Sequence, residues 1–348
     1  MQHDLEKARA TFAAITNNEK LFSYMTDLDL DFYLTKTESL TKENISHQLD
    51  RIDHRNIVDL AIATSTDIET ANRFLSRIET SYTGKEMQYL LNLALQPKAW
   101  IRIDQPQKIS NLKIELSQKK IDIFEANGYY YFIQNPQLKN LHSYQKGIFD
   151  FQDLASQSLT TGLPKNFKPQ TIWDACAGGG GKSFVLNQLY PNAKIFSSDI
   201  RSYKLDNISK KSKTLNIDKI KTFNHDATKQ LPQEYLPSSQ PFDLVIVDAP
   251  CTSSGTIRRS PDTVLRLSNN VIGELVNLQS KILEIASDSV GLGGFLIYST
   301  CSIFIEENES MVNNFLKMKP NFKIYSQEMV GSPDADSDSM FKAILQRI

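Results

Sequence analysis

A mainly parallel α/β sheet is the fold that the sequence predicts from residue 170 onward, because short apolar strands alternate there with amphipathic helices. The expected strands are Thr171–Asp174, Lys194–Ser198, Lys221–Asn224, Asp243–Asp248, Gly294–Ser299, Phe322–Tyr325 and Phe341–Leu345. The expected helices are Ser202–Leu215, Asn269–Val290 and Glu306–Met318. A glycine-rich turn after the first strand, and aspartates near the ends of four strands, indicate a Rossmann-like sheet of seven strands with a ligand site at its carboxyl edge.

Two segments with different residue patterns precede the chain that forms this sheet. Residues 1–95 have apolar residues at three- and four-residue spacing and are expected to be helical. Residues 96–150 read as a small α+β module, since Trp100–Asp104 alternates like a strand. Residues 151–348 are expected to form the α/β domain, in which the acidic, serine-rich stretch 331–339 is predicted to be a solvated loop.

Composition narrows the classes of protein that the chain can belong to. It has a net charge of −1 and three cysteines, Cys176, Cys251 and Cys301, and these are not spaced as zinc ligands. A disulfide framework and a metal site are therefore not expected, and any nucleic acid must be bound by local patches. No apolar run approaches the ~20 residues that cross a bilayer, and the N-terminus is polar, so we expect a cytoplasmic protein without a membrane segment.

The glycine run from Gly178 to Gly181 follows the first strand and precedes a helix. Such a turn lets a ligand approach the backbone closely, and the helix N-terminus favours an anionic group. Gly181-Lys182-Ser183 also imitates the end of a nucleotide-binding phosphate loop. That loop requires a first glycine at position 176, which is a cysteine, so the spacing excludes it. A packing turn remains the alternative for the glycines alone.

Two thiols follow neighbouring strands. Cys251 comes three residues after Asp248 at the end of one strand, and Cys301 follows the next strand. Adjacent strands lie about 4.8 Å apart, so both sulfurs can face one substrate. Buried cysteines are more often small apolar fillers, and for Cys176 we keep that interpretation. Beside a methyl donor, two thiols and an aspartate suit methylation of cytosine carbon 5, because a thiolate that adds to carbon 6 makes carbon 5 nucleophilic.

From about residue 98 to the C-terminus, the chain resembles the Fmu/Sun (RsmB-type) RNA cytosine-C5 methyltransferases, relatives of the NSUN proteins. Three segments carry the resemblance in order, namely Asp174–Lys182, Asp248-Ala249-Pro250-Cys251 and Ser299-Thr300-Cys301-Ser302. Gly178-Gly179 stands where the family usually has Ala-Pro. The resemblance implies a Rossmann-like methyltransferase domain that takes its methyl group from S-adenosylmethionine.

The resemblance also implies a role for each site residue. Cys301 would be the nucleophile, Cys251 would assist breakdown of the adduct, and Asp248 would hold the cytosine edge near the methyl donor. Asp199 would bind the donor's ribose and Asp226 its adenine amine. The loop that holds the methionine end would be Cys176, Ala177, Gly178, Gly179, Gly180, Gly181 and Lys182. Spacing alone leaves the choice of nucleophile between Cys251 and Cys301 open.

The expected partner is RNA, and the small-subunit ribosomal RNA is favoured over transfer RNA. Arg258, Arg259 and Arg266 follow the Pro-Cys motif and are the expected phosphate contacts. The 96–150 module and the helical 1–95 region are expected to help bind RNA, and the protein is expected to be a monomer. Two other functions stay open: a non-catalytic RNA-binding or ribosome-assembly factor, and a methyltransferase that acts on DNA.

Overall fold

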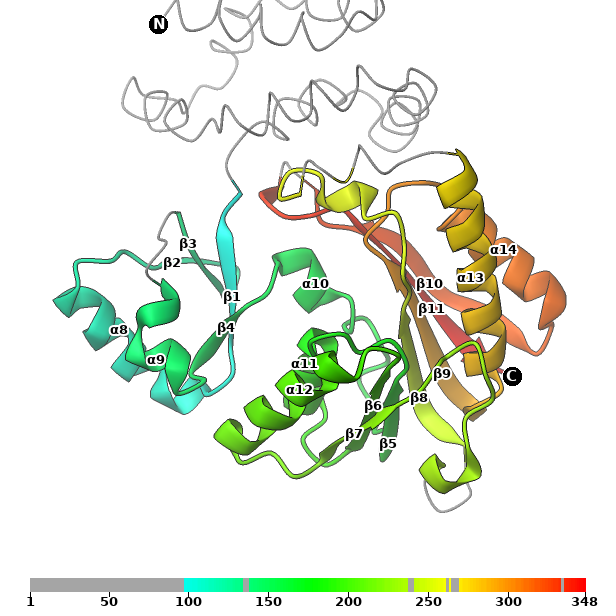
Figure 1. Ribbon diagram of the computed structural model, residues 1–348, viewed down its shortest axis with the longest axis horizontal. Coiled ribbons are helices and arrows are strands. Elements are labelled where there is room, and N and C mark those ends of the chain that lie inside the picture. Colours follow the sequence, from blue (N-terminus) through cyan, green and yellow to red (C-terminus); the bar gives the residue numbers. More distant parts are fainter. Residues whose placement is uncertain (1–96, 134–137, 237–240, 261–262, 264–268, 333–334) are drawn as a thin grey trace, which may run out of the picture.

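The computed structural model describes residues 97–133, 138–236, 241–260, 263, 269–332 and 335–348. The expected helical region 1–95 lies outside these ranges. The described chain forms two sheets, a small one near its start and a large one that fills the rest (Figure 1). None of the helices in the described ranges has the length and hydropathy to span a membrane.

The large sheet has seven strands in the order β10-β11-β9-β8-β5-β6-β7. Its strands are β5 (Thr171–Asp174), β6 (Lys194–Asp199), β7 (Ile220–Asn224), β8 (Phe242–Asp248), β9 (Val290–Thr300), β10 (Phe322–Val330) and β11 (Met340–Arg347). The five strands β5 to β9 run parallel, whereas β11 is antiparallel to β9 and β10. This confirms the predicted mainly parallel, seven-stranded sheet. After β7 the chain returns to the other side of β5, which places a ligand crevice at the carboxyl ends of β5 and β8.

Helices cover both faces of this sheet (Figure 1). The helices α11 (Gly181–Leu189) and α12 (Ser202–Leu215) pack on one face, and α13 (Asn269–Ser287) and α14 (Glu309–Met318) pack on the other. The sequence of β8 permits this arrangement. Leu244 and Ile246 belong to the core on the face covered by α11 and α12, and Val245 and Val247 belong to the core on the face covered by α13 and α14. A strand buried on both faces needs such a continuous apolar run.

Two helix boundaries differ from the prediction. α13 ends at Ser287 rather than at Val290, because Val290 pairs with Phe242 and begins β9. α14 begins at Glu309 rather than at Glu306. The preceding Glu307 and Asn308 are fully buried, and their side chains hydrogen-bond Thr252 in the loop after β8 and Thr300 and Ser302 at the end of β9.

The small sheet is antiparallel, with strand order β2-β3-β1-β4. Its strands are β1 (Ala99–Ile103), β2 (Phe124–Ala126), β3 (Tyr129–Phe132) and β4 (Phe149–Phe151). It packs with α8 (Ile109–Gln118) and α9 (His142–Gln145) around a core that contains Leu112, Leu116, Phe132 and Phe149. The short helix α10 (Leu154–Ser158) leads from this module to the large sheet.

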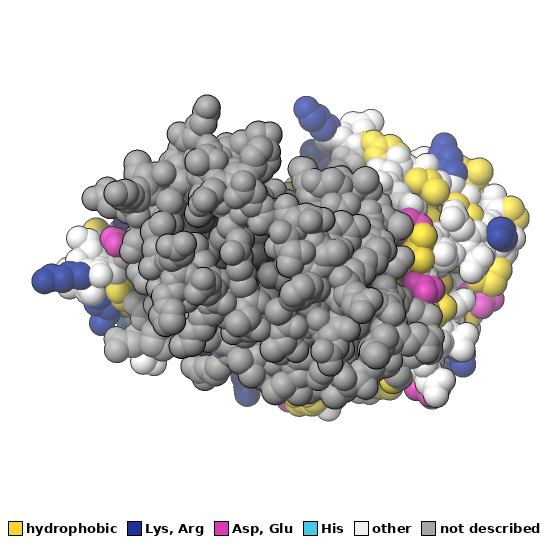
Figure 2. Space-filling view, turned by 90° about the horizontal axis from the view of Figure 1, so that it is seen from above, with side chains coloured by type: hydrophobic (Ala, Val, Ile, Leu, Met, Phe, Trp, Pro, Cys, Tyr) yellow, Lys and Arg dark blue, Asp and Glu magenta, His cyan; other side chains and the backbone are white. Residues whose placement is uncertain are grey.

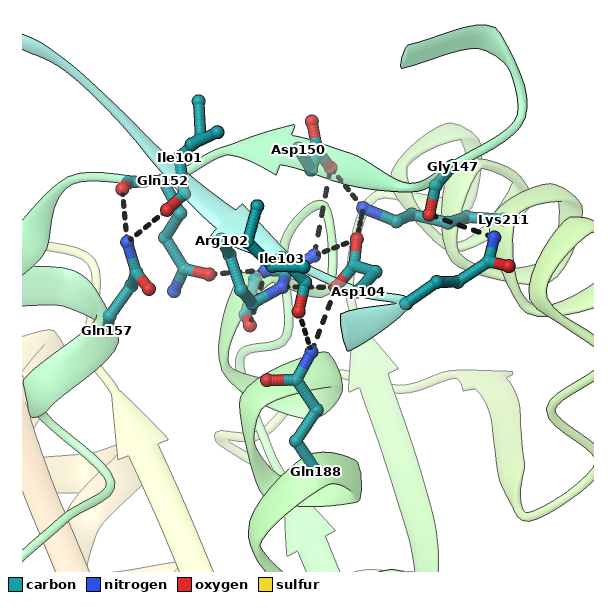
Figure 3. Close-up of polar contacts among 12 residues, drawn as sticks. Ile101, Arg102, Ile103, Asp104, Gly147, Asp150, Gln152, Gln157, Gln188 and Lys211 are labelled. Atoms are coloured by element: carbon teal, nitrogen blue, oxygen red, sulfur yellow. Dashed lines mark hydrogen bonds and ion pairs between the residues drawn. The ribbon is translucent and has the colours of Figure 1, made fainter. Parts of the chain in front are cut away.

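A buried cluster of charges joins the small module to the large domain (Figure 3). Arg102 in β1 donates to Asp104 at 2.6 Å and to the carbonyl of Gly181, the first residue of α11, at 3.1 Å. Lys211 of α12 forms ion pairs with Asp104, at 2.7 Å, and with Asp150 of β4. Since the side chains of Arg102 and Asp104 are only 3% and 2% exposed, the pair that they form is shielded from solvent. The module therefore contacts the helix that begins with the glycine loop.

Charges on the outer surface are mixed in sign. On the described part of the face shown in Figure 2, basic, acidic and apolar side chains are interspersed. This agrees with the net charge of −1 of the whole chain. A strongly basic face, the usual electrostatic footprint of a nucleic-acid-binding protein, is therefore not visible on the described surface in this view.

Candidate active site

A crevice of about 660 Å³ opens at the carboxyl ends of β5, β6, β8 and β9. The residues that line it come from the ends of these strands, from the loops that follow them and β7, and from α11 and α13. The expected site residues among them are Cys176, Ala177, Gly178, Gly179, Gly181, Lys182, Asp199, Asp226, Asp248, Cys251 and Cys301. The fold therefore brings the two halves of the predicted site together in one cavity. Gly180 is not part of its wall.

The glycine loop is shaped for close approach of a ligand to the backbone. Gly180 has φ 85°, and a β-carbon there would lie 2.7 Å from Ile208, so a side chain is excluded by both conformation and space. Gly178 and Gly179, in contrast, face open space on the crevice side. The loop leads into the N-terminus of α11, where free amides favour a carboxylate. These features fit the methionine end of S-adenosylmethionine.

Asp199 at the end of β6 supplies the acceptor that a ribose diol requires. Its carboxylate accepts hydrogen bonds from the Gly178 amide at 2.9 Å and from the Arg201 side chain at 2.9 and 3.0 Å. Burial by itself raises the pKa of Asp199, but these hydrogen bonds outweigh it and hold the pKa below the ordinary value. The carboxylate therefore stays ionised. Asp226 also lines the crevice, held by hydrogen bonds from Thr228 at 2.7 and 3.0 Å.

Asp174 departs from the expectation that four strand-end aspartates converge on the crevice. It lies beneath the glycine loop, fully buried, and accepts a 2.6 Å hydrogen bond from Ser183. Burial, followed by the nearby carboxylate of Asp248, raises the pKa of Asp174 to about 7 despite that hydrogen bond. Only Asp199, Asp226 and Asp248 of the four reach the crevice wall. Asp174 thus binds Ser183 at the start of α11 and is not part of the crevice wall.

Replacing Asp174 by asparagine is expected to flatten the dependence of stability on pH. Because the folded-state pKa of about 7 lies above the ordinary 3.8, the folded state retains a proton between these values that the unfolded chain releases. The free energy of unfolding of the wild type therefore falls as pH rises through this window. Asparagine keeps an acceptor for Ser183 and cannot ionise. Denaturant unfolding at several pH values measures the change, and parallel curves for both proteins would contradict it.

The two thiols form a hydrogen-bonded pair. The sulfurs of Cys251 and Cys301 lie 3.2 Å apart, and the Cys301 sulfur lies 3.3 Å from the hydroxyl of Ser253. The hydrogen bond from Cys251 lowers the pKa of Cys301, and Ser253 and Lys182 act in the same direction against burial. The same bond and burial raise the pKa of Cys251. The nearby Lys182 and Ser253 therefore favour Cys301 over Cys251 as the thiol that loses its proton.

Lys182 and Asp248 form an ion pair between the glycine loop and the thiols. Burial lowers the pKa of Lys182, but Asp248 outweighs this and holds the pKa above its ordinary value. Asp248 also accepts a hydrogen bond from Ser299 at 3.0 Å. The Asp248 carboxylate is thus held between the glycine loop on one side of the crevice and the two thiols on the other. Cys176 faces the same cavity, and burial followed by nearby carboxylates raises its pKa, which makes it a poor nucleophile.

Two of the arginines expected to contact RNA pair with aspartates of this chain. Arg258 is 3% exposed and pairs with Asp336. Arg259 pairs with Asp338. Arg266 lies outside the described residues. The predicted solvated loop is wrong for residues 337–339, which are buried: the Asp338 carboxylate pairs with Arg259, and the Ser339 amide donates to the carbonyl of Gly255 in the loop after β8.

Sequence reasoning missed Glu307, Ser253 and Ser299. Ser253, two residues after the Pro-Cys motif, hydrogen-bonds Cys301. Ser299, which is part of the Ser299–Ser302 motif but was given no role, hydrogen-bonds Asp248. Glu307 is a fully buried carboxylate behind the thiols, six residues after Cys301. No local pattern separates it from its neighbour Glu306, because its partners come from other segments of the chain.

The comparisons with known proteins decide the family. A family model described as 16S rRNA methyltransferase RsmB/F matches residues 164–344, which is more than half of the chain. The chain belongs to this family. Family membership confirms the expected resemblance, and with it S-adenosylmethionine as the cofactor on which these methyltransferases depend.

Relatives of the RsmB/F family align with most of this chain. The ribosomal RNA small subunit methyltransferase B of Enterobacter sp. (strain 638) is 28% identical over 269 residues, covering 75% of this chain and 60% of that protein. The protein of the same name from Photorhabdus laumondii is 29% identical over 261 residues, covering 73% and 59%. The chain therefore spans about 60% of the length of these relatives.

Solved structures show the same fold. The crystal structure of PH0851 superimposes with a TM-score of 0.70 at 26% identity, covering 78% of this chain and 65% of that one. NSun6 from Pyrococcus horikoshii with SFG superimposes with a TM-score of 0.63 at 17% identity, covering 79% and 97%. At this lower identity the likeness shows the fold alone. Both agree with the predicted Rossmann-like methyltransferase sheet.

Proposed function

We propose that this protein methylates carbon 5 of a cytosine in RNA through a covalent bond between Cys301 and the base. One observation carries the proposal: two thiols 3.2 Å apart face a crevice whose other wall is a glycine loop with an ionised Asp199. A thiol that ionises readily, a second thiol that keeps its proton and a fixed carboxylate are the groups that this reaction needs. The names of the relatives favour small-subunit ribosomal RNA as the substrate.

The reaction assigns one task to each described side chain. The Cys301 thiolate adds to carbon 6, which makes carbon 5 electron-rich. Asp248 lies beside the pair; its carboxyl group holds the polar edge of the cytosine and passes a proton to the ring nitrogen as the thiolate adds, so that the negative charge developing on the ring is neutralised. S-adenosylmethionine, when bound, supplies the methyl group that carbon 5 attacks. After carbon 5 loses its proton to water, the bond between Cys301 and carbon 6 breaks, and the thiol hydrogen of Cys251 stabilises the departing sulfur.

A base inside this crevice must be unstacked from its neighbours. The thiols are only partly accessible, and the loops after β8 and β9 surround them. Enzymes that react with a base atom generally move the nucleotide into such a pocket or act on single-stranded segments. We therefore infer that the target cytosine lies in an unpaired or readily opened part of the RNA.

The proposed activity is tested with the full chain, S-adenosylmethionine labelled in its methyl group, and three unmodified substrates in parallel. The substrates are small-subunit ribosomal RNA, transfer RNA and double-stranded DNA. Label in 5-methylcytosine of ribosomal RNA, identified by mass spectrometry of the nucleosides, is the expected result. Label in transfer RNA alone would change the substrate, and label in DNA alone would overturn the RNA proposal. A protein that binds RNA but transfers no label to any substrate would be a binding or assembly factor.

A further inference from the structure

Glu307 is a buried carboxylate that the reaction described above does not use. It is fully buried, and both of its oxygens are hydrogen-bonded. Oε1 accepts from the Thr252 amide at 2.9 Å and from the Gln279 side chain at 2.8 Å. Oε2 accepts from the Thr252 hydroxyl at 2.5 Å and from the Ser302 hydroxyl. Four donors directed at two oxygens are the environment of an ionised carboxylate.

The partners of Glu307 belong to the two loops that carry the thiols. Thr252 directly follows Cys251, and Ser302 directly follows Cys301. The hydroxyls of Thr252 and Ser302 also lie 3.1 Å apart, so the two loops meet around this carboxylate. Gln279 of α13 completes the group, because its side-chain nitrogen also donates to the carbonyl of Pro250 at 2.9 Å. The position of one sulfur relative to the other therefore depends on Glu307.

The charge of Glu307 acts on the pair from its buried side. The other titratable or charged groups around the two sulfurs are Lys182, Asp248, Arg259 and Tyr298. Lys182 lies on the crevice side and favours ionisation of Cys301. After the hydrogen bond to Cys301 and burial, the negative charge of Glu307 contributes to the raised pKa of Cys251. The two thiols thus experience different fields although their sulfurs are in contact.

We propose that Glu307 is a positioning residue of the thiol pair: its buried carboxylate ties the Cys251 loop to the Cys301 loop, and its charge keeps the shared proton on Cys251. This role rests on the proposed function, because it explains how one of two adjacent thiols becomes the nucleophile. It adds to that function the residue that assigns the two thiols their different tasks.

Glu307→Gln separates the charge from the contacts. A glutamine can place its oxygen at Oε1, where it accepts from Thr252 and Gln279, and its nitrogen at Oε2, where it donates to the two hydroxyls. The variant therefore keeps the link between the loops and loses the negative charge. Alanine is less informative, because it would leave two buried amide donors without an acceptor.

The test measures which sulfur reacts, without RNA and without the methyl donor. The wild type and Glu307→Gln are treated with limiting iodoacetamide over a range of pH, and alkylation of Cys251 and Cys301 is quantified by peptide mass spectrometry. In the wild type, Cys301 is expected to react first. In Glu307→Gln, the ratio of Cys301 to Cys251 alkylation is expected to fall by about tenfold, the effect of roughly one pKa unit from a nearby charge.

Val312→Ala serves as the matched control, because Val312 is fully buried in the adjacent α14 and belongs to the apolar core rather than to the hydrogen-bonded group around Glu307. It lowers stability but should leave the alkylation ratio unchanged. An unchanged ratio in Glu307→Gln would overturn the proposed role of the charge. The same fall in both variants would show a merely structural effect. If the ratio falls only in Glu307→Gln while the wild type methylates no RNA, the positioning role stands and the proposed function fails.

Discussion

Cys301→Ala is expected to abolish methyl transfer to RNA, with a fall in rate of at least about 10⁴-fold. Without the sulfur, carbon 6 has no nucleophile, and carbon 5 remains too electron-poor to attack a methyl group. The fold should survive, because a cysteine to alanine change removes one partly exposed atom. The rate is measured as label transferred from S-adenosylmethionine to RNA, and thermal unfolding confirms that the variant is folded.

Cys251→Ala is expected to give the complementary result, a protein–RNA complex that survives denaturation. Its thiol hydrogen bond to Cys301 is lost, so the departing sulfur is less stabilised and the adduct breaks down more slowly. Gel electrophoresis under denaturing conditions detects the complex. Gly273→Ala, which changes an exposed position of α13 outside the crevice, is the control and should neither stop transfer nor trap RNA. If Cys301→Ala still methylates while Cys251→Ala is inactive, the nucleophile is Cys251.

Gly255→Ala is expected to lower both stability and activity strongly. A β-carbon at this position would lie 1.8 Å from the carbonyl oxygen of Ser339 and 3.2 Å from that of Cys301. Both are backbone atoms, so the loops after β8 and β9 and the start of β11 must move apart. Overpacking of this kind costs about 3 kcal/mol, and the shift also displaces Cys301. Denaturant unfolding and the rate of methyl transfer measure the two effects.

Gly273→Ala provides the control for this substitution. Gly273 lies in α13 with open space where its β-carbon would be placed, so alanine should stabilise the helix by about 1 kcal/mol. Methyl transfer should not change. A Gly255→Ala protein with wild-type stability and activity would contradict the close packing of Gly255 against Ser339.

The strands of the sheet and the two thiols could be predicted because their signals are local. Short apolar strands that alternate with amphipathic helices predicted β5 to β9. Because neighbouring parallel strands end at the same edge of the sheet, Cys251 and Cys301 were expected to lie together there. Burial of charge could not be predicted in the same way. Asp174 and Arg258 follow strands like the other site residues, yet one lies beneath the loop and the other pairs with Asp336. Their partners are distant in the sequence, and only the packed chain shows them.

The two parts of the site lie on opposite sides of the crossing from β7 back to β8, so they are synthesised one after the other. The loops proposed to bind the methyl donor lie between residues 174 and 226, and the groups proposed to bond to the base lie between residues 248 and 301. β5, β6 and β7 form a contiguous parallel unit, and chains generally fold from the N-terminal side as they emerge from the ribosome. The proposed nucleophile, Cys301, is therefore synthesised after the loops proposed to bind the methyl donor. A nascent chain that has reached only β7 carries the donor loops but neither thiol of the pair, and so it cannot trap RNA in a covalent complex.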